Sequence, residues 1–302
     1  AITTLSIGIA LITDQTESAD EALRAAESAL KEAMKAGGNQ IVIHRINLPS
    51  LEEEQQWSQR IERAMEENRL HLYFQPIVAL HGEPKPMYEV LLRLIGEAGE
   101  VILPETFLPF AAHAGMLPAL DRWVTERTLE LLAKQHQPIH LFVKLDDSTL
   151  LDEGFVPWVA EQIRDARFSP EQLIFEIREL SAATHLKQAK AFVEDLRAMH
   201  VGVAISHFGE GIHPFGILKH IKADYLMIDG AFIRQLAQDP EKQETVRNLV
   251  EQAKSLGKIV IAENVEDANS LALLWQFGVH YARGYYIQVP SESLDFDFQA
   301  SL

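Results

Sequence analysis

The feature that most constrains this fold is a regular alternation of strand-like and helical segments across residues 70–290. Eight short runs rich in β-branched, aromatic and other apolar residues recur there: LYFQPIVAL, YEVLLRL, IHLFVKLD, LIFEIRE, GVAISHF, DYLMID, KIVIAENV and YARGYYI. Helical stretches such as 185–200 and 241–256 lie between most of them. The alternation predicts an α/β fold of the (β/α)8-barrel type. A doubly wound open sheet is the alternative, because periodicity alone does not separate the two.

Residues 1–46 show a shorter pattern of strand, helix and strand. TTLSIGIAL is strand-like, the segment after Ser18 has helical apolar spacing up to Gly37 and Gly38, and QIVIHRI returns as a strand. Residues 47–69 are polar and acidic, and they predict a helical linker. Because the chain opens inside the apolar stretch AITTLSIGIALI, we expect it to be a piece of a longer protein.

Charge and composition exclude several classes of function. The 302-residue chain has 27 Lys and Arg against 44 Asp and Glu, a net charge of −17 that disfavours binding to nucleic acid or anionic membranes. It has no cysteine, which excludes disulfides and thiolate chemistry and fits a reducing cytoplasm. Because the sequence shows no signal peptide and no long apolar run, we expect no membrane insertion.

Polar residues recur at the ends of the predicted strands. In a barrel such residues meet at one mouth, and a mixture of carboxylates and basic groups is typical of a site for a phosphate-bearing ligand. Each residue alone is more often a cap or an ion pair, but their recurrence on successive strands favours a shared site. The residues are Gln75, Glu89, Arg93, Lys144, Glu176, Arg178, His207, Asp229, Glu263 and Arg283.

Several motifs resemble the EAL domain family of cyclic di-GMP phosphodiesterases. YFQPIV, YEVLLR, FEIRE, FGEG, DYLMIDGAFI, IAENVE and ARGYYI occur in the family's order. The resemblance implies a modified TIM (β/α)8 barrel, the EAL fold, over residues 70–302, with a cyclic di-GMP pocket at its mouth. Residues 1–46, with SIGIA and AGGN, similarly resemble the C-terminal remnant of a GGDEF domain, joined to the barrel by the linker at 47–69.

The chain departs from this family at positions tied to catalysis. The departures are Val90 for Ala, Lys144 for Asn, Arg178 for Thr, Ser206 and His207 for two Asp, Met227 for Lys, and Arg283 for Gln. The resemblance implies two Mg²⁺ ions in active members, and Mg²⁺ requires octahedral oxygen ligands. We therefore expect no metal site, no catalytic residues and no phosphodiesterase activity.

Residues that the family uses for ligand binding are largely kept. Arg93 matches a phosphate-contacting arginine, and Asp121 matches an aspartate that can accept from a guanine edge, although a helix N-cap is an alternative for Asp121. The cations at 144, 178 and 283 either replace metal charge or pair with neighbouring glutamates, and both interpretations stay open. The resemblance implies binding of cyclic di-GMP without Mg²⁺ through Gln75, Glu89, Val90, Leu91, Leu92, Arg93, Asp121, Phe208, Asp229, Glu263, Arg283, Gly284, Tyr285 and Pro290.

The Glu-Val-Leu sequence at 89–91, with a GGDEF-like segment upstream, most resembles cyclic di-GMP receptors of type IV pilus assembly and twitching motility. That likeness implies a PilZ-domain protein as partner and a location at the cell pole. We therefore expect a receptor that signals through protein partners, and we leave open a dimer formed through regions outside this sequence. The alternatives are a weak metal-dependent phosphodiesterase and an interaction scaffold without nucleotide.

Overall fold

The chain divides into two compact units, Ala1–Gln56 and Trp57–Leu302, in a computed structural model. Helix α2 (Leu51–Glu66) spans the boundary between them. The predicted strand residues before Leu5, the helix stop at Gly37 and the start of the predicted linker lie outside the described residues. The structure describes residues 5–10, 18–35, 38–44 and 51–299.

The N-terminal unit follows the predicted order of strand, helix and strand. Strands β1 (Ile7–Ala10) and β2 (Ile41–His44) pair in parallel, and α1 (Ala19–Lys35) connects them. Gly8 permits the close approach of helix and strand, because a Cβ there would lie 2.2 Å from the Ala26 carbonyl oxygen of α1. That this unit derives from a GGDEF domain stays a prediction.

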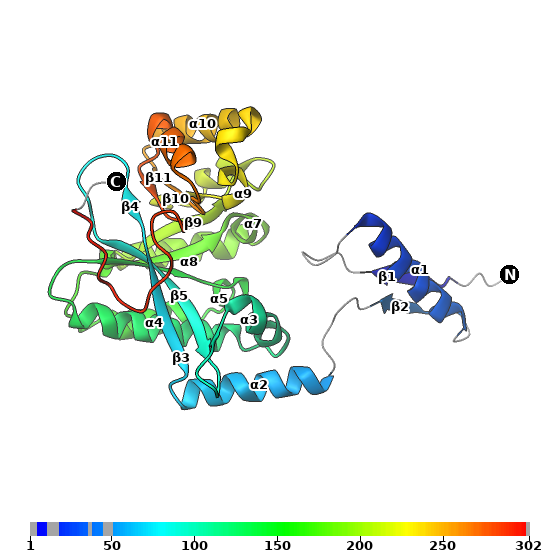
Figure 1. Cartoon of the computed structure of the whole chain (residues 1–302). Helices are drawn as coiled ribbons and strands as arrows, with labels where there is room; N and C mark the ends of the chain where they lie inside the picture. The colour runs from blue at the N-terminus through cyan, green and yellow to red at the C-terminus, as the bar shows by residue number, and fades with distance from the viewer. Residues whose placement is uncertain (1–4, 11–17, 36–37, 45–50, 300–302) are drawn as a thin grey trace. The chain divides into compact units, whose positions relative to one another are not determined.

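The C-terminal unit is built on a ten-stranded mixed sheet (Figure 1). Its strands are β3 (Leu70–Pro76), β4 (Val78–Ala79), β5 (Met87–Ile95), β6 (Val101–Ile102), β7 (His140–Lys144), β8 (Leu173–Arg178), β9 (Gly202–Phe208), β10 (Tyr225–Ile228), β11 (Ile259–Ala262) and β12 (Tyr281–Ala282). Strands β5 and β7 to β12 pair in parallel with their neighbours. At the two ends, β3 pairs antiparallel with β5, and β4 pairs antiparallel with β12.

One bend of the chain nearly closes this sheet into a barrel. Only Ile77 separates β3 from β4, so the two ends of the strand order are consecutive in the sequence. The first strand is antiparallel to its neighbour, which departs from a regular TIM barrel, and the modified TIM barrel implied by the resemblance is confirmed. The closing bend excludes the open, doubly wound alternative.

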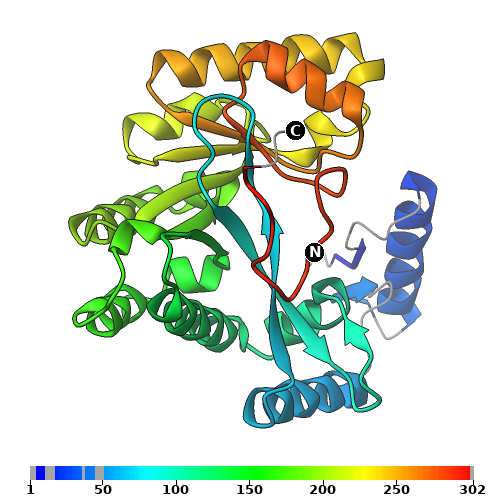
Figure 2. The same ribbon diagram turned by 60° about the vertical axis from the view of Figure 1, so that its left-hand side comes forward.

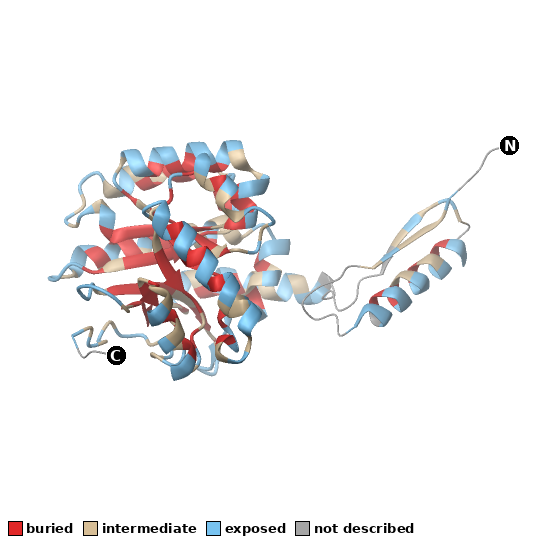
Figure 3. Ribbon diagram, turned by 90° about the horizontal axis from the view of Figure 1, so that it is seen from above, coloured by how far each residue is buried: buried red, intermediate tan, exposed pale blue. Residues whose placement is uncertain are grey.

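Helices of the C-terminal unit surround its sheet (Figure 2). They are α3 (Pro104–His113), α4 (Leu117–Lys134), α5 (Asp147–Leu150), α6 (Phe155–Ile163), α7 (Glu179–Thr184), α8 (Leu186–Ala198), α9 (Gly230–Ile233), α10 (Pro240–Ser255) and α11 (Ala268–Phe277), with 3₁₀ turns η1 (Pro170–Gln172), η2 (Pro214–Lys219) and η3 (Leu236–Gln238). Buried residues follow the sheet and the inner faces of the helices, and exposed residues follow the outer faces (Figure 3). None of the described helices combines the length and apolar character needed to span a membrane.

Two hydrophobic layers hold the barrel together. The larger layer packs the helices against the outer face of the sheet, where α8 contributes Phe192, Val193 and Leu196. The smaller layer fills the interior, with one residue from each parallel strand and one from the bend. Its members are Ile77, Met87, Phe142, Ile174, Ala204, Met227, Ile261 and Tyr281. Alternate residues of a strand face the same side. The residue two positions after each interior residue therefore also faces inward, at the open end of the barrel, which we call the mouth.

Candidate functional site

Eight polar residues form a ring directly above the interior hydrophobic layer. On each parallel strand, the residue two positions after the interior one is polar. Gln75 completes the set, because it lies opposite Glu89 in the register of β3 and β5. We call these residues the mouth ring, and they are Gln75, Glu89, Lys144, Glu176, Ser206, Asp229, Glu263 and Arg283.

Arg283 is the buried cation of the mouth ring. Its guanidinium forms ion pairs with Glu89 and Glu263, the latter at 2.7 Å, and donates a longer hydrogen bond of 3.3 Å to the Gln75 side-chain oxygen. Burial opposes the charge, but the carboxylates of Glu89, Glu263 and Glu176 together raise the pKa of Arg283 above its ordinary value. Of the two interpretations left open for Arg283, the geometry favours pairing with glutamates.

Glu176 has no such partner. It is fully buried, and neither carboxyl oxygen has a hydrogen-bond partner among the described residues. Burial, and then the charge of Glu89, raise the pKa of Glu176 well above its ordinary value. The ring contains four carboxyl groups but only two cations, so it has a surplus of negative charge that protonation or a further cation would neutralise.

A β-bulge adds a ninth side chain to this site. Ile205 pairs with Leu226, but Phe208 pairs with Ile228, so β9 carries one extra residue at this point. His207 adopts a left-handed backbone with φ of 52°, a conformation rare outside glycine that is found at functional sites. Its Nδ1 lies 2.5 Å from Asp229 Oδ2, and its Nε2 lies 3.1 Å from Lys144 Nζ.

A buried carboxylate holds the loop that follows the bulge. Glu179 Oε2 accepts a hydrogen bond of 2.7 Å from the Gly209 amide, and the Gly211 amide also donates to this carboxylate. Gly209 has φ of 106°, which other residues rarely adopt. Burial raises the pKa of Glu179. The glycine turn predicted from the sequence is thus tied to the start of α7.

The two residues expected to recognise the nucleotide lie close to the mouth ring. Arg93 is buried, lies over the Tyr73 ring at 5.4 Å, and donates to the Leu92 carbonyl. Asp121 Oδ2 accepts from the Asp146 amide at 2.8 Å, at the end of β7. The N-cap alternative for Asp121 is wrong, because Asp121 lies inside α4, whose N-cap residue is Met116.

Asp121 is also held by a second donor, and it is shielded from solvent. The Thr149 hydroxyl donates to its Oδ2 at 2.6 Å. Burial raises the pKa of Asp121 to about 6, although both hydrogen bonds act in the opposite direction. Its second oxygen, Oδ1, is the one left to accept from a ligand.

Three of the residues predicted to bind the ligand point away from the mouth. The side chains of Val90 and Leu92 pack in the outer hydrophobic layer because they alternate with mouth-facing residues, and Phe208 packs there because the bulge at His207 changes its face. Only the backbone of these three residues can contact a ligand at the mouth. The prediction that they bind cyclic di-GMP is therefore corrected for their side chains. Tyr285, three residues after the end of β12, is 66% exposed.

The donor set of the site fits one divalent cation. His207, Asp229 and Glu263 each offer a ligand atom, and these atoms lie within 4.8 Å of one another. The pair of oxygen-liganded Mg²⁺ ions implied by the resemblance fits less well, since Ser206 supplies only a hydroxyl and Arg283 already pairs with Glu89. Sequence reasoning missed this set because its members come from three different strands without a local motif.

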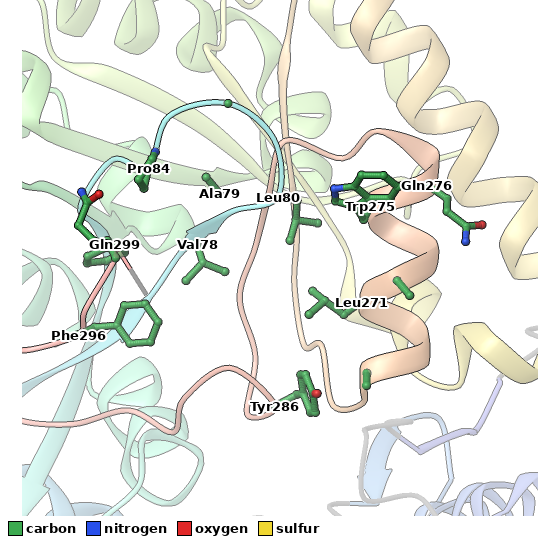
Figure 4. Close-up of a pocket in the computed structure, with 14 residues that line it drawn as sticks. Val78, Ala79, Leu80, Pro84, Leu271, Trp275, Gln276, Tyr286, Phe296 and Gln299 are labelled. Carbon is green, nitrogen blue, oxygen red and sulfur yellow. The ribbon is translucent and has the colours of Figure 1, made fainter. Parts of the chain in front are cut away.

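A separate cavity lies between β4, α11 and the C-terminal segment (Figure 4). Its volume is about 760 Å³, and Leu80, Leu271, Trp275, Tyr286 and Phe296 are among its lining residues. It shares no residue with the mouth ring, and none of its lining residues is charged. It therefore offers no charged side chain to pair with a phosphate.

Comparison with known proteins identifies the C-terminal unit. The EAL domain matches residues 58–290. The chain is 33% identical over 239 residues to the cyclic di-GMP phosphodiesterase PdeF of Escherichia coli, covering 78% of this chain and 32% of PdeF. It is 30% identical over 293 residues to the cyclic di-GMP phosphodiesterase PdeB of Shewanella oneidensis, covering 95% of this chain and 34% of PdeB. The chain thus spans about a third of the length of these curated relatives.

A solved structure is similar to the same region. The FimX EAL domain of Pseudomonas aeruginosa bound to c-di-GMP is 39% identical with a TM-score of 0.76, covering 80% of this chain and 99% of that one. The likeness to a cyclic di-GMP-binding EAL domain that the sequence predicts is therefore confirmed as a likeness.

The prediction that phosphodiesterase activity is lost is wrong. PdeF and PdeB, which are related to this chain along most of its length, are named phosphodiesterases. Ser206 and His207 replace two carboxylates of the family. The folded chain nevertheless brings three potential metal ligands together, one of them the imidazole of His207. With its match across residues 58–290 and its nearly closed barrel, this chain belongs to the EAL domain family.

Proposed function

We propose that this chain binds cyclic di-GMP at the mouth ring and that binding requires no Mg²⁺. The observation that carries the proposal is the 39% identity to the FimX EAL domain whose structure contains c-di-GMP. Arg93 and the exposed Lys144 are the cations available to the two phosphates, since Arg283 is held by carboxylates. A guanidinium suits a phosphate because it donates two parallel hydrogen bonds.

The other contacts follow from the positions of three side chains. Asp121 accepts from the N1–H and N2–H₂ edge of a guanine through its remaining oxygen lone pairs. The half-buried Leu91 and the exposed Tyr285 provide apolar surfaces for the bases. Stacking on such surfaces contributes about 1–3 kcal/mol per base.

Titration calorimetry with cyclic di-GMP in EDTA tests the proposal. Arg93→Ala should weaken binding about tenfold or more, because a charge-assisted phosphate contact contributes roughly 1.5–3 kcal/mol. Arg164→Ala is the matched control, since Arg164 is an exposed arginine at the end of α6 and away from the mouth. Equal affinity of the wild type and Arg93→Ala would place the phosphate elsewhere, and absence of binding in EDTA would contradict the proposal itself.

We further propose that the bound chain signals through a PilZ-domain protein in type IV pilus assembly and twitching motility, at the cell pole. The likeness to FimX supports this assignment. Mixing the chain with the PilZ-domain protein of the same genome, with and without cyclic di-GMP, tests it by sedimentation. A complex that forms only in the presence of cyclic di-GMP is expected.

Deletion of the gene that encodes this chain should abolish twitching motility. Normal twitching in the deletion strain would contradict the pilus role.

A second candidate function is metal-dependent hydrolysis of cyclic di-GMP, which the names of PdeF and PdeB favour. His207, Asp229 and Glu263 would hold the cation. A divalent cation there would supply Lewis-acid polarisation of the phosphate and a water nucleophile at neutral pH. Chromatography of the nucleotide after incubation with Mn²⁺ should show the linear product, and Asp229→Ala should abolish it. Absence of product would exclude this candidate and leave nucleotide binding unaffected.

A further inference from the structure

The bulge in β9 places a nitrogen ligand in a site that is otherwise built from oxygen donors. His207 lies against Asp229, and both share the mouth with Glu263. Asp229 uses its Oδ1 to accept from the Ala231 amide at 2.7 Å, which orients the carboxylate and leaves Oδ2 toward His207. Three protein ligands from β9 and from the ends of β10 and β11 therefore converge before any cation is present.

A second observation indicates that this site takes a cation. Glu176 is fully buried on the neighbouring strand β8, with both carboxyl oxygens unpartnered among the described residues. It follows the interior residue Ile174 by two positions, so its carboxyl group faces the mouth. The buried Ser206 hydroxyl, also without a partner among these residues, lies on the same face. The ring carries more carboxyl groups than cations, and a divalent charge would offset the difference.

We propose that His207, Asp229 and Glu263 form a site for one divalent transition metal, such as Co²⁺, Mn²⁺ or Zn²⁺, in preference to Mg²⁺. Imidazole nitrogen suits these ions, whereas Mg²⁺ prefers oxygen ligands and parts reluctantly with its waters. This inference rests on the second candidate function, metal-dependent hydrolysis. It does not depend on whether the chain binds cyclic di-GMP in EDTA.

Lys144 is the residue that competes with the metal. Its Nζ lies 3.1 Å from His207 Nε2, so it places a positive charge beside the site. The side chain is exposed, so it can move aside at little cost in packing. Removal of this lysine should therefore strengthen metal binding, which a purely structural cluster would not do.

Equilibrium dialysis and visible spectroscopy with Co²⁺ test the proposal, because the d–d bands of Co²⁺ report nitrogen and oxygen ligation. The wild type should bind Co²⁺ at least about tenfold more tightly than Mg²⁺. His207→Gly should lose this preference and the d–d bands, since glycine tolerates the left-handed backbone. His207→Asn, which also tolerates that backbone, should bind more weakly than the wild type. Lys144→Ala should bind several-fold more tightly.

His213→Ala is the matched control, because His213 is an exposed histidine in the following loop. Its affinity for Co²⁺ should equal that of the wild type. Equal Co²⁺ binding by the wild type and both His207 variants would overturn the proposal, as would equal affinity for Mg²⁺ and Co²⁺. Titration of the wild type with cyclic di-GMP in EDTA separates the two proposals, because nucleotide binding in EDTA can persist when the preference for Co²⁺ is absent.

Discussion

At the scale of single residues, the half-buried carboxyl group of Asp121 links stability to the proposed recognition of guanine. Burial raises its pKa from the ordinary 3.8 to about 6 in the folded chain. Its contribution to stability is therefore complete below about pH 4 and is lost as the pH rises through about 6, a change of roughly 3 kcal/mol. At neutral pH the folded chain thus contains an ionised carboxylate in an unfavourable place, as expected for a group retained for binding.

Asp121→Asn should stabilise the chain at about pH 7 and flatten the pH dependence between about pH 4 and 7. The amide oxygen still accepts from Asp146 and Thr149, but the side chain no longer ionises. Urea unfolding at several pH values measures the effect. The same variant should bind cyclic di-GMP more weakly, because an amide cannot accept from both donors of a guanine edge. An Asn variant less stable than the wild type at neutral pH would mean that the charged hydrogen bonds outweigh burial.

At the scale of elements, the bulge in β9 and the loop after it determine the shape of the mouth. The run GVAISHF predicts the strand correctly, but the bulge depends on how β9 pairs with β10. A sequence pattern carries no information on that pairing. Glu179 then holds the loop through the amides of Gly209 and Gly211. The loop is therefore held by one side chain rather than by a strand.

Glu179→Ala should release this loop. Two amides lose their acceptor, which costs roughly 1–3 kcal/mol, and hydrogen exchange at Gly209 and Gly211 should accelerate markedly. Glu179→Gln is the control, because its carbonyl oxygen can still accept from one amide. Exchange measured by NMR or mass spectrometry gives the result. Unchanged protection in Glu179→Ala would show that other contacts hold the loop.

At the scale of the whole molecule, the proposed nucleotide site belongs to one of the two units. All mouth-ring residues, Arg93 and Asp121 lie within Trp57–Leu302. A chain of residues 51–302, which keeps α2 intact, should bind cyclic di-GMP with an affinity within about twofold of the whole chain, since no site residue is removed. Titration calorimetry of cyclic di-GMP into each of the two chains measures and compares these affinities. A loss of binding in a folded shorter chain would show that residues 1–50 contribute to the site.

The sequence by itself determined the strands, the barrel class and most members of the mouth ring, because each strand repeats apolar and polar residues at a local period of two. Seven of the eight ring residues are among the strand-end residues expected from the sequence, and Ser206 is the exception. Only the tertiary structure decided which groups meet: Arg283 with Glu89 from strands far apart in the chain, and His207 with Asp229 across a bulge. Likewise, only strand pairing showed that Phe208 packs in the outer layer, because the bulge shifts it out of the alternation of β9. Local periodicity specifies the face of a strand, whereas register, bulges and closure depend on contacts between distant segments.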